Sequence, residues 1–249
     1  MSQPGNTMLL EEGQCRLVVV QDQLTPCPYI DGVTARMPLR LPVGTVTPEV
    51  TDELLAMGYR RSGDFLYRTQ CPTCNECRPT RIDAREFRAT ASMRRILNRG
   101  HRDLHWHWGQ PRVDARRVSL FNLHRQVRDL GQGSGAIDAE SYRSFLTDTC
   151  CNTMELSISR EDRLIAVSIV DVGARSTSAV YTFFDPAEHR YSLGSFAILK
   201  QIQWAQRTDR HYVYLGMYVE SNRHLNYKAR FAPQQRLIDH QWVDFSKPG

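Results

Sequence analysis

Short apolar runs and changes in hydrophobic period divide the chain into alternating strands and helices. The run LVVV at 17–20 predicts a strand. Thr47-Pro48-Glu49 combines a capping hydroxyl, an early proline and an acid, so a helix is expected to begin there and to end at Gly58. Further elements are expected as a hairpin over 59–68, a strand over 80–87, a basic helix over 90–98 stopped by Gly100, and a strand over 101–108.

The second half continues with helical spacing from Asp114 to Gly131 and a second helix from Asp138. The segment GQGSG at 131–135 is the one stretch whose composition predicts flexibility. Strands are then expected over 153–159, 164–172 and 177–184, followed by a helix over 193–208, a strand over 211–217, a short helix over 221–229 and a last strand over 236–243. Strands around a central helix indicate a mixed α/β or α+β fold built on one sheet, with a boundary near 100–110 after a cysteine-bearing front part.

The net charge of +5 is modest, but its distribution along the chain indicates a candidate binding partner. Residues 60–117 hold 14 arginines, no lysine and 6 carboxylates, whereas the rest of the chain is slightly acidic. Because guanidinium pairs bidentately with phosphate, this block favours a polyanion such as RNA as partner. The alternative is a solvated face with local ion pairs.

Three of the seven cysteines are concentrated in the loop CPTCNECRP at 71–79. Cys71, Cys74 and Cys77 have the spacing of loops that wrap a zinc ion or an iron–sulfur cluster, and Cys27 is the preferred fourth ligand, with Cys15 in reserve. Loop thiols that bind nothing are the alternative. Cys150 and Cys151, between a predicted helix and a strand, are expected to pack in the core.

No apolar run is long enough to cross a membrane, and the first residues lack the pattern of a signal peptide. A cytoplasmic location without membrane association is therefore expected, and in that reducing compartment thiols or metal ligands are favoured over disulfides.

Six blocks resemble the bacterial aspartate/glutamate leucyltransferases, which are related to the eukaryotic arginyltransferases. They extend from about Cys27 to Trp242 in the family's order and spacing, and read CPYIDG (27–32), YRTQCPTCNECRPTRI (67–82), AVYTFFDP (179–186), RYSLGSFAILKQI (190–202), YVYLGMYV (212–219) and NYKARF (226–231). The resemblance implies transfer of leucine from leucyl-tRNA to the α-amine of proteins that begin with Asp or Glu, which marks them for degradation by the N-degron pathway.

The resemblance also implies an α+β fold. It consists of a cysteine-bearing N-terminal domain at 1–105 and a C-terminal domain at 106–249 like the GCN5-related N-acetyltransferases (GNAT-like). Eukaryotic relatives hold an iron–sulfur cluster or another metal on cysteines, but the spacing differs in this chain. The transfer itself is aminolysis of an activated ester, so no cofactor is required for the chemistry.

Candidate catalytic residues follow two predicted strands. Asp185 ends the strand YTFFDP and is the first choice for a catalytic role, either taking or relaying the amine proton or hydrogen-bonding a ribose hydroxyl, although turn aspartates before proline are common. Lys228, one of only three lysines, is a candidate for contact with the tRNA or with the forming oxyanion. Tyr227 beside it is expected to stack on a base or simply to pack.

Two arginine-rich regions and a helix start are candidates for tRNA binding. Arg94, Arg95 and Arg99 on the basic helix suit the tRNA backbone. Arg190, Ser192, Gly194 and Ser195 lie where a helix N-terminus can bind phosphate, although simple capping would look the same. This segment departs from the glycine-rich acetyl-CoA loop, which argues against an acetyltransferase.

The acidic N-terminus of an acceptor requires a cation. Arg36, Arg68, Arg78 and Arg81 flank the cysteine loops and are the candidates. His101, His105 and His107 suit a partly exposed strand face better than a metal site. Arginine in place of leucine as the donated residue, and a non-catalytic metal-bearing RNA-binding module, are the alternatives that remain.

Overall fold

The computed structural model describes residues 8–9, 15–130 and 135–245. Its centre is an eight-stranded sheet in which most neighbouring strands are antiparallel. In spatial order the sheet contains β15 (Gln241–Phe245), β14 (Gln234–Ile238), β8 (Arg78–Asp83), β13 (Tyr212–Tyr218), β12 (Ser176–Phe184), β11 (Arg163–Val172), β10 (Thr153–Arg160) and β9 (His105–Gly109).

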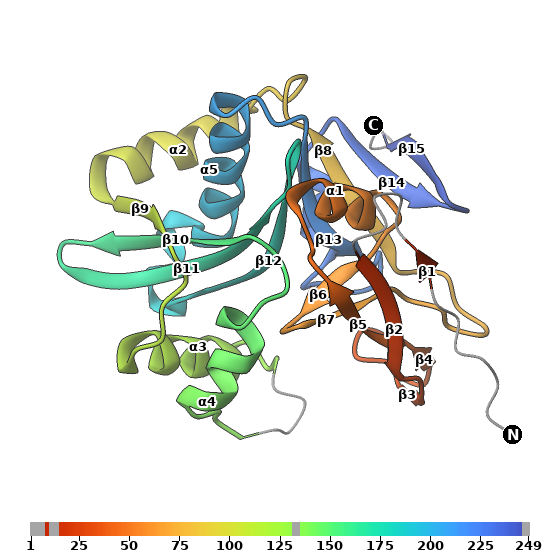
Figure 1. Ribbon diagram of the computed structural model, residues 1–249. Coiled ribbons are helices and arrows are strands. Elements are labelled where there is room, and N and C mark those ends of the chain that lie inside the picture. The colour runs from red at the N-terminus through yellow and green to blue at the C-terminus, as the bar shows by residue number, and fades with distance from the viewer. Residues whose placement is uncertain (1–7, 10–14, 131–134, 246–249) are drawn as a thin grey trace, which may run out of the picture.

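A smaller five-stranded sheet lies beside the large one (Figure 1). It is ordered β1 (Met8–Leu9), β2 (Cys15–Gln21), β5 (Leu39–Gly44), β7 (Phe65–Tyr67) and β6 (Arg60–Ser62), and β3 (Leu24–Pro26) pairs separately with β4 (Thr34–Arg36). The expected strand at 17–20 and hairpin at 59–68 are both confirmed. The division into domains at residue 105 stays a prediction, and β8, from the first part of the chain, belongs to the large sheet.

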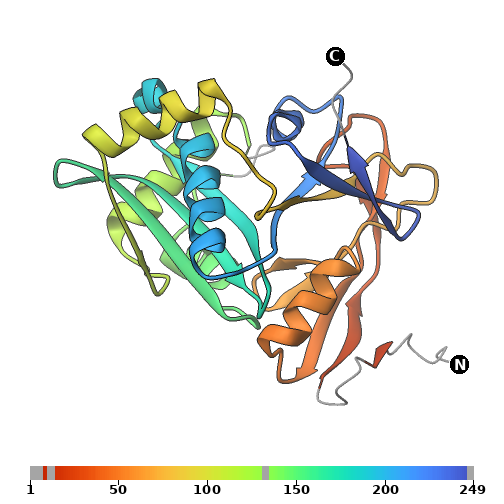
Figure 2. The same cartoon turned by 90° about the horizontal axis from the view of Figure 1, so that it is seen from above.

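Helices cover both faces of the left half of the large sheet in Figure 1. On one face lie α2 (Ala91–Asp103) and α5 (Leu193–Arg207), as seen again from above in Figure 2, and on the other lie α3 (Ala115–Val127) and α4 (Ala139–Tyr142). The remaining helical segments are α1 (Pro48–Ala56), which packs on the small sheet, the π-helical turn η1 (Arg143–Thr147), and the 3₁₀ turns η2 (Pro186–Tyr191) and η3 (Asn226–Arg230).

Polar side chains begin four of these helices as the sequence predicts. Thr47 Oγ1 accepts from Val50 N at 3.3 Å, and Thr90, Asp114 and Asp138 cap α2, α3 and α4 in the same way. Each cap satisfies an amide that the helix itself leaves unpaired, and is worth about 1 kcal/mol.

Three separate cores follow from this arrangement. The largest lies between the sheet and α2 with α5, and it includes Trp106 and Trp108 on the same side of β9, as their alternation predicts. A second lies under α3 and α4, and the third joins α1 to the small sheet. Cys150 and Cys151 pack against this third core, which confirms their expected structural role.

Two expected boundaries are wrong. Gly100 does not stop α2, which continues to Asp103 because the absence of a side chain lets the helix pack directly on Phe196 of α5; a Cβ at Gly100 would lie 2.2 Å from Phe196 Cε2. The last strand is a hairpin, β14–β15, because Asp239 and His240 both adopt positive φ and reverse the chain. The expected helix at 221–229 is confirmed only in part, by η3, and the predicted flexible segment 131–135 lies outside the described residues except for Gly135.

Among the described residues, no helix has both the length and the apolar character needed to span a bilayer.

Candidate active site

The parallel strands β12 and β13 separate after a short contact. They pair only from Ser176 to Ser178 on β12 and from Tyr212 to Tyr214 on β13. Beyond that point β12 remains hydrogen-bonded to β11, and β13 remains hydrogen-bonded to β8. The pairing of β13 with β8 shifts register between Tyr214 and Gly216, and Gly216 has a φ of +83°. The parting strands therefore leave main-chain groups that do not pair with each other.

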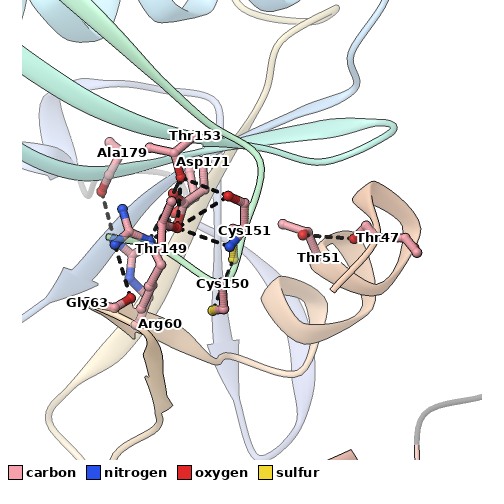
Figure 3. Close-up of polar contacts among 12 residues, drawn as sticks. Thr47, Thr51, Arg60, Gly63, Thr149, Cys150, Cys151, Thr153, Asp171 and Ala179 are labelled. Carbon is pink, nitrogen blue, oxygen red and sulfur yellow. Dashed lines mark hydrogen bonds and ion pairs between the residues drawn. The ribbon is translucent and has the colours of Figure 1, made fainter. Parts of the chain in front are cut away.

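Arg60 of β6 reaches into this place from the small sheet. Its Nη1 donates to Ser178 Oγ at 2.9 Å and its Nη2 donates to Ala179 O at 2.8 Å (Figure 3). The side chain is buried, and burial lowers the pKa of Arg60. Both hydrogen-bond partners are neutral.

Lys228 of η3 meets Arg60 at Gly216. Its Nζ donates to Met217 O at 2.5 Å, and burial together with Arg60 lowers the pKa of Lys228 to about 7. A Cβ at Gly216 would lie 2.9 Å from Arg60 Nη2 and 3.6 Å from Lys228 Nζ. Within the described residues neither side chain has a carboxylate within ion-pair distance, and the one carboxylate that acts on Arg60 from further away, Asp171, is already paired with Arg61, so an anion would stabilise positive charge on the pair.

The CPYIDG segment and the cysteine loop approach the same two cations. The Tyr67 hydroxyl, burial and the nearby Cys77 raise the pKa of Tyr29, while Arg60 acts in the opposite direction. Asn222, in the segment after β13, donates from Nδ2 to Tyr29 O at 3.0 Å and so fixes this loop. Segments from three separate parts of the chain thus form one polar site.

The neighbouring ion pair is structural. Arg61 Nε donates to both oxygens of Asp171 at 3.0 Å. Thr153 Oγ1 also donates to Asp171 Oδ1, at 2.7 Å (Figure 3). Both charged side chains are almost fully buried. Asp171 is therefore occupied by Arg61, whereas Arg60 donates to neutral oxygens only.

The four predicted metal-binding cysteines lie near one another. Burial and the neighbouring Cys27, Cys71 and Cys74 raise the pKa of Cys77 to about 12. All four are free thiols, and Cys71 Sγ accepts a hydrogen bond from Arg36 N at 3.5 Å. In the described part of the chain, however, no three His, Cys, Asp or Glu side chains are arranged to hold a metal ion. The donor chemistry suits a thiophilic metal, but the arrangement does not complete a site, so we assign no step to a metal.

Asp185 lies at the end of β12 with both carboxylate oxygens engaged. Oδ2 accepts from Arg163 Nη1 at 2.6 Å, and Oδ1 accepts from Ala187 N at 3.0 Å, which caps η2. Tyr227 is partly buried and packs against the largest core. The chemical roles of both residues stay predictions, and of the three catalytic candidates only Lys228 borders the site at Gly216.

The predicted tRNA-binding residues lie on α2 and around the start of α5, and Arg99 connects the two groups. Arg94, Arg95 and Arg99 are exposed on α2, and Arg99 Nη1 donates to Arg190 O in η2. Ser192 follows with left-handed backbone and makes no side-chain cap, while Gly194 and Ser195 form the first turn of α5. A Cβ at Gly194 would lie 3.4 Å from Phe184 Cε1, which places this helix start beside the end of β12.

The four arginines proposed to bind the acceptor N-terminus lie in different settings. Arg36 is exposed and pairs with Asp22, and Arg78 begins β8. Arg68 stacks on Tyr59 and has a buried Nε without a hydrogen-bond partner. Arg81 donates to Gln235 and Tyr214 and lies against the rings of Tyr212 and Trp242. Sequence reasoning missed Arg60, because Arg60-Arg61 looks like any charged pair until the partner of each is known.

Two family models match most of the chain. The model described as the C terminus of arginine-tRNA-protein transferase matches residues 116–238, and the model of the N terminus matches residues 25–95. The chain belongs to the arginine-tRNA-protein transferase family. The predicted family and the predicted aminoacyltransferase class are thereby confirmed.

Relatives within the arginine-tRNA-protein transferase family include proteins named aspartate/glutamate leucyltransferase. One from Acinetobacter baylyi is 35% identical over 228 residues, covering 90% of this chain and 83% of the relative. Another from Shewanella is 33% identical over 220 residues, covering 88% of this chain and 91% of the relative. The similarity thus extends over nearly all of both molecules.

A likeness among solved structures concerns the fold alone. The chain superposes on a structure assigned as the C-terminal domain of a lysylphosphatidylglycerol synthetase from Agrobacterium fabrum, with a TM-score of 0.51 and 13% identity, covering 86% of this chain and 71% of that one. The mixed α/β architecture with one large sheet is confirmed.

Proposed function

We propose that the protein transfers leucine from leucyl-tRNA to the α-amine of proteins that begin with Asp or Glu. The single observation that carries the proposal is the buried pair of Arg60 and Lys228, which has no carboxylate within ion-pair distance among the described residues. A side-chain carboxylate of the acceptor supplies the missing anion. The names of the relatives from Acinetobacter and Shewanella support both the donor and the acceptor.

In the reaction the acceptor's amine nitrogen attacks the ester carbonyl of the aminoacyl-tRNA. A C–N bond forms, the C–O bond to the terminal ribose breaks, and the proton lost by the amine ends on the ribose hydroxyl. Arg60 and Lys228 hold the acceptor carboxylate, so the amine is fixed close to the ester. Asp185 ends β12 six residues beyond Ala179, about 20 Å along an extended strand from the Arg60 contact, so it cannot take the proton directly from an amine held at Arg60, and its catalytic role stays a prediction.

The tRNA is proposed to lie across α2 and the start of α5, on Arg94, Arg95, Arg99, Arg190, Ser192, Gly194 and Ser195. The C-terminal part, 106–249, then corresponds to a GNAT-like acyltransferase domain, and the front part, 1–105, supplies Arg60 and the cysteine loop. We further propose that the protein acts in the cytoplasm in the N-degron pathway.

The direct test is transfer of labelled leucine or labelled arginine, each from its charged tRNA, to peptides that begin with Asp, Glu, Asn, Lys or Ala. Leucine on the Asp and Glu peptides alone is the expected result. Arginine on those peptides would replace the proposed donor but keep the acceptor. Tight tRNA binding without any transfer would favour the RNA-binding module.

Variants identify the group that recognises the acceptor. Arg60→Gln and Lys228→Met are expected to lower kcat/KM for the Asp peptide by at least a hundredfold, since each loses a charge-assisted contact in a buried site. Arg85→Gln is the matched control, because Arg85 is exposed, pairs with Asp209 and is not a candidate for the acceptor site. Equal losses in all three variants would contradict the assignment of the acceptor site to Arg60 and Lys228.

A further inference from the structure

A cavity lies away from the parted strands, between α2, β9 and α5. Its volume is about 590 Å³, within the range typical of small-ligand pockets. It is lined by His101, Trp106, Lys200, Gln203, Gln206 and Arg207. The reaction proposed above uses none of these residues.

Lys200 is the unusual member of this cavity. Its side chain is buried, its Nζ lies 3.7 Å from the centre of the Trp106 ring, and its nearest polar neighbour is His101 Nε2 at 3.4 Å. No carboxylate forms an ion pair with it among the described residues. A buried ammonium held by an aromatic face and an imidazole lacks the anion that usually accompanies it.

Arg207 adds a second positive charge to the same cavity. Burial and the repulsion from Arg207 lower the pKa of Lys200 to about 8, and burial and Lys200 lower the pKa of His101. Arg207 therefore disfavours the charged form of Lys200, and Lys200 disfavours the charged form of His101, in one space. An entering anion would relieve this repulsion, so the cavity favours a ligand with negative charge.

The uncharged part of the lining indicates what carries that charge. The rings of His101 and Trp106 lie 5.1 Å apart at an interplanar angle of 31° and form an aromatic wall. The amide of Gln203 has no hydrogen-bond partner among the described residues and can therefore pair with the edge of a base. An aromatic wall, a free amide and paired cations together fit a nucleotide, whereas a simple carboxylate would not need the rings.

The position of the cavity connects it to the proposed tRNA path. His101 is on α2, two residues after Arg99, and Arg99 contacts Arg190 in η2 just before α5 begins. The cavity lies further along α5, around Lys200 and Arg207. The exposed arginines of α2, Arg94, Arg95 and Arg99, lie on the same helix as His101 of the cavity.

We infer that this cavity binds one unpaired nucleotide of the tRNA, with its base against His101 and Trp106 and its phosphate between Lys200 and Arg207. The inference rests on the proposed function for the identity of the RNA. It adds an anchoring point remote from the parted strands, so that the body of the tRNA is held independently of the ester being attacked.

The test measures binding of uncharged tRNA, which does not depend on transfer. Lys200→Met, Trp106→Leu and Arg207→Gln are each expected to weaken binding roughly tenfold, since loss of one stacked base or phosphate contact has about this effect. Arg85→Gln is the control, because Arg85 is an exposed arginine that pairs with Asp209. Arg207 is exposed, so its variant leaves the core intact even where Lys200→Met or Trp106→Leu fails to fold.

Salt dependence and a second probe complete the test. In Lys200→Met and Arg207→Gln one phosphate contact is lost, so the slope of log K against log salt concentration should become less steep by about one. Arg85→Gln should keep the wild-type slope. AMP should bind weakly to the cavity and compete with tRNA. Folded cavity variants that bind tRNA as Arg85→Gln does would overturn the inference. So would AMP binding that depends on Lys200 without competition from tRNA, because the ligand would then be a free nucleotide.

Failure here and failure of the proposed function remain distinguishable. At saturating leucyl-tRNA the cavity variants should keep the wild-type kcat on the Asp peptide and show a raised KM for tRNA. A wild-type protein that transfers nothing contradicts the proposed function, whereas normal transfer with an unchanged KM in the variants contradicts the cavity alone.

Discussion

Arg60 and Lys228 approach each other across Gly216, a residue without a side chain. The two cations come from elements 168 positions apart in the chain, and Gly216 leaves the space that both occupy. Its φ of +83° is also a conformation that favours glycine over other residues. This glycine is therefore the point at which the small sheet and the segment after β13 contribute to one site.

Gly216→Ala should accordingly impair recognition of the acceptor. A Cβ would lie 2.9 Å from Arg60 Nη2, so the guanidinium must move, and a displacement near 1 Å can cost about a hundredfold in rate. We expect kcat/KM for an Asp peptide, measured on folded protein, to fall by that order. Gly135→Ala is the matched control, since nothing lies within 4 Å of its Cβ. Wild-type kcat/KM in Gly216→Ala would show that Arg60 does not need its observed position.

Breaking the buried pair of Arg61 and Asp171 should destabilise the fold. The two side chains are 1% and 4% exposed, so Asp171→Asn leaves a buried guanidinium without its counter-charge, at a cost of about 3–5 kcal/mol. Urea unfolding measures this loss. Asp22→Asn breaks an exposed pair with Arg36 and should cost less than about 1 kcal/mol. Similar losses in the two variants would contradict the importance of burial.

Gly100→Ala should disturb the packing of α2 on α5. The added methyl would lie 2.2 Å from Phe196 Cε2, and overpacking of this kind costs about 1–3 kcal/mol, although alanine favours the helix itself. The free energy of unfolding should therefore fall in Gly100→Ala and partly recover in the double variant Gly100→Ala/Phe196→Leu. A Gly100→Ala protein more stable than the wild type would mean that the two helices can separate without loss.

His124 should make the protein less stable in acid. Its ring is buried against Phe184, and burial lowers the pKa of His124 from 6.5 to about 4. The unfolded chain therefore takes up a proton as the pH falls below 6.5, while the folded protein does so only near 4. Stability is lost between these values, amounting to about 2–3 kcal/mol by pH 4.5.

The check compares the free energy of unfolding at pH 7 and pH 4.5 in His124→Gln and in the wild type. The variant should lose about 2–3 kcal/mol less over this interval, because glutamine does not titrate. His105→Gln, at an exposed position on β9, should behave as the wild type does. An unchanged pH dependence in His124→Gln would exclude His124 as the cause.

Local signals predicted most of the elements but not their ends. Caps such as Thr47 and Asp114 act within one helical turn, so the sequence is sufficient to place them. Gly100 misleads because its role depends on Phe196, which is distant in sequence. The β14–β15 turn was missed because Asp239-His240 is not the usual composition for two consecutive residues with positive φ.

The residues of the site could also be predicted only in part from the sequence. Lys228 could be singled out because lysine is rare in this chain, and the motif NYKARF resembled the family. Arg60 could not, because fourteen arginines between 60 and 117 look equivalent in the sequence. Arg61 pairs with the carboxylate of Asp171, whereas Arg60 donates only to neutral oxygens. That difference arises only when distant strands are brought together.

The place of β8 in the large sheet bears on how the protein is made. This strand pairs with β13 on one side and with β14 on the other, although both are synthesised more than a hundred residues later. During translation β8 therefore emerges before either neighbouring strand exists. Its main-chain N–H and C=O groups cannot pair within the sheet until the last part of the chain has been made. A nascent molecule holds Arg60 long before it holds Lys228, so the enzyme cannot begin to act until its synthesis is almost finished.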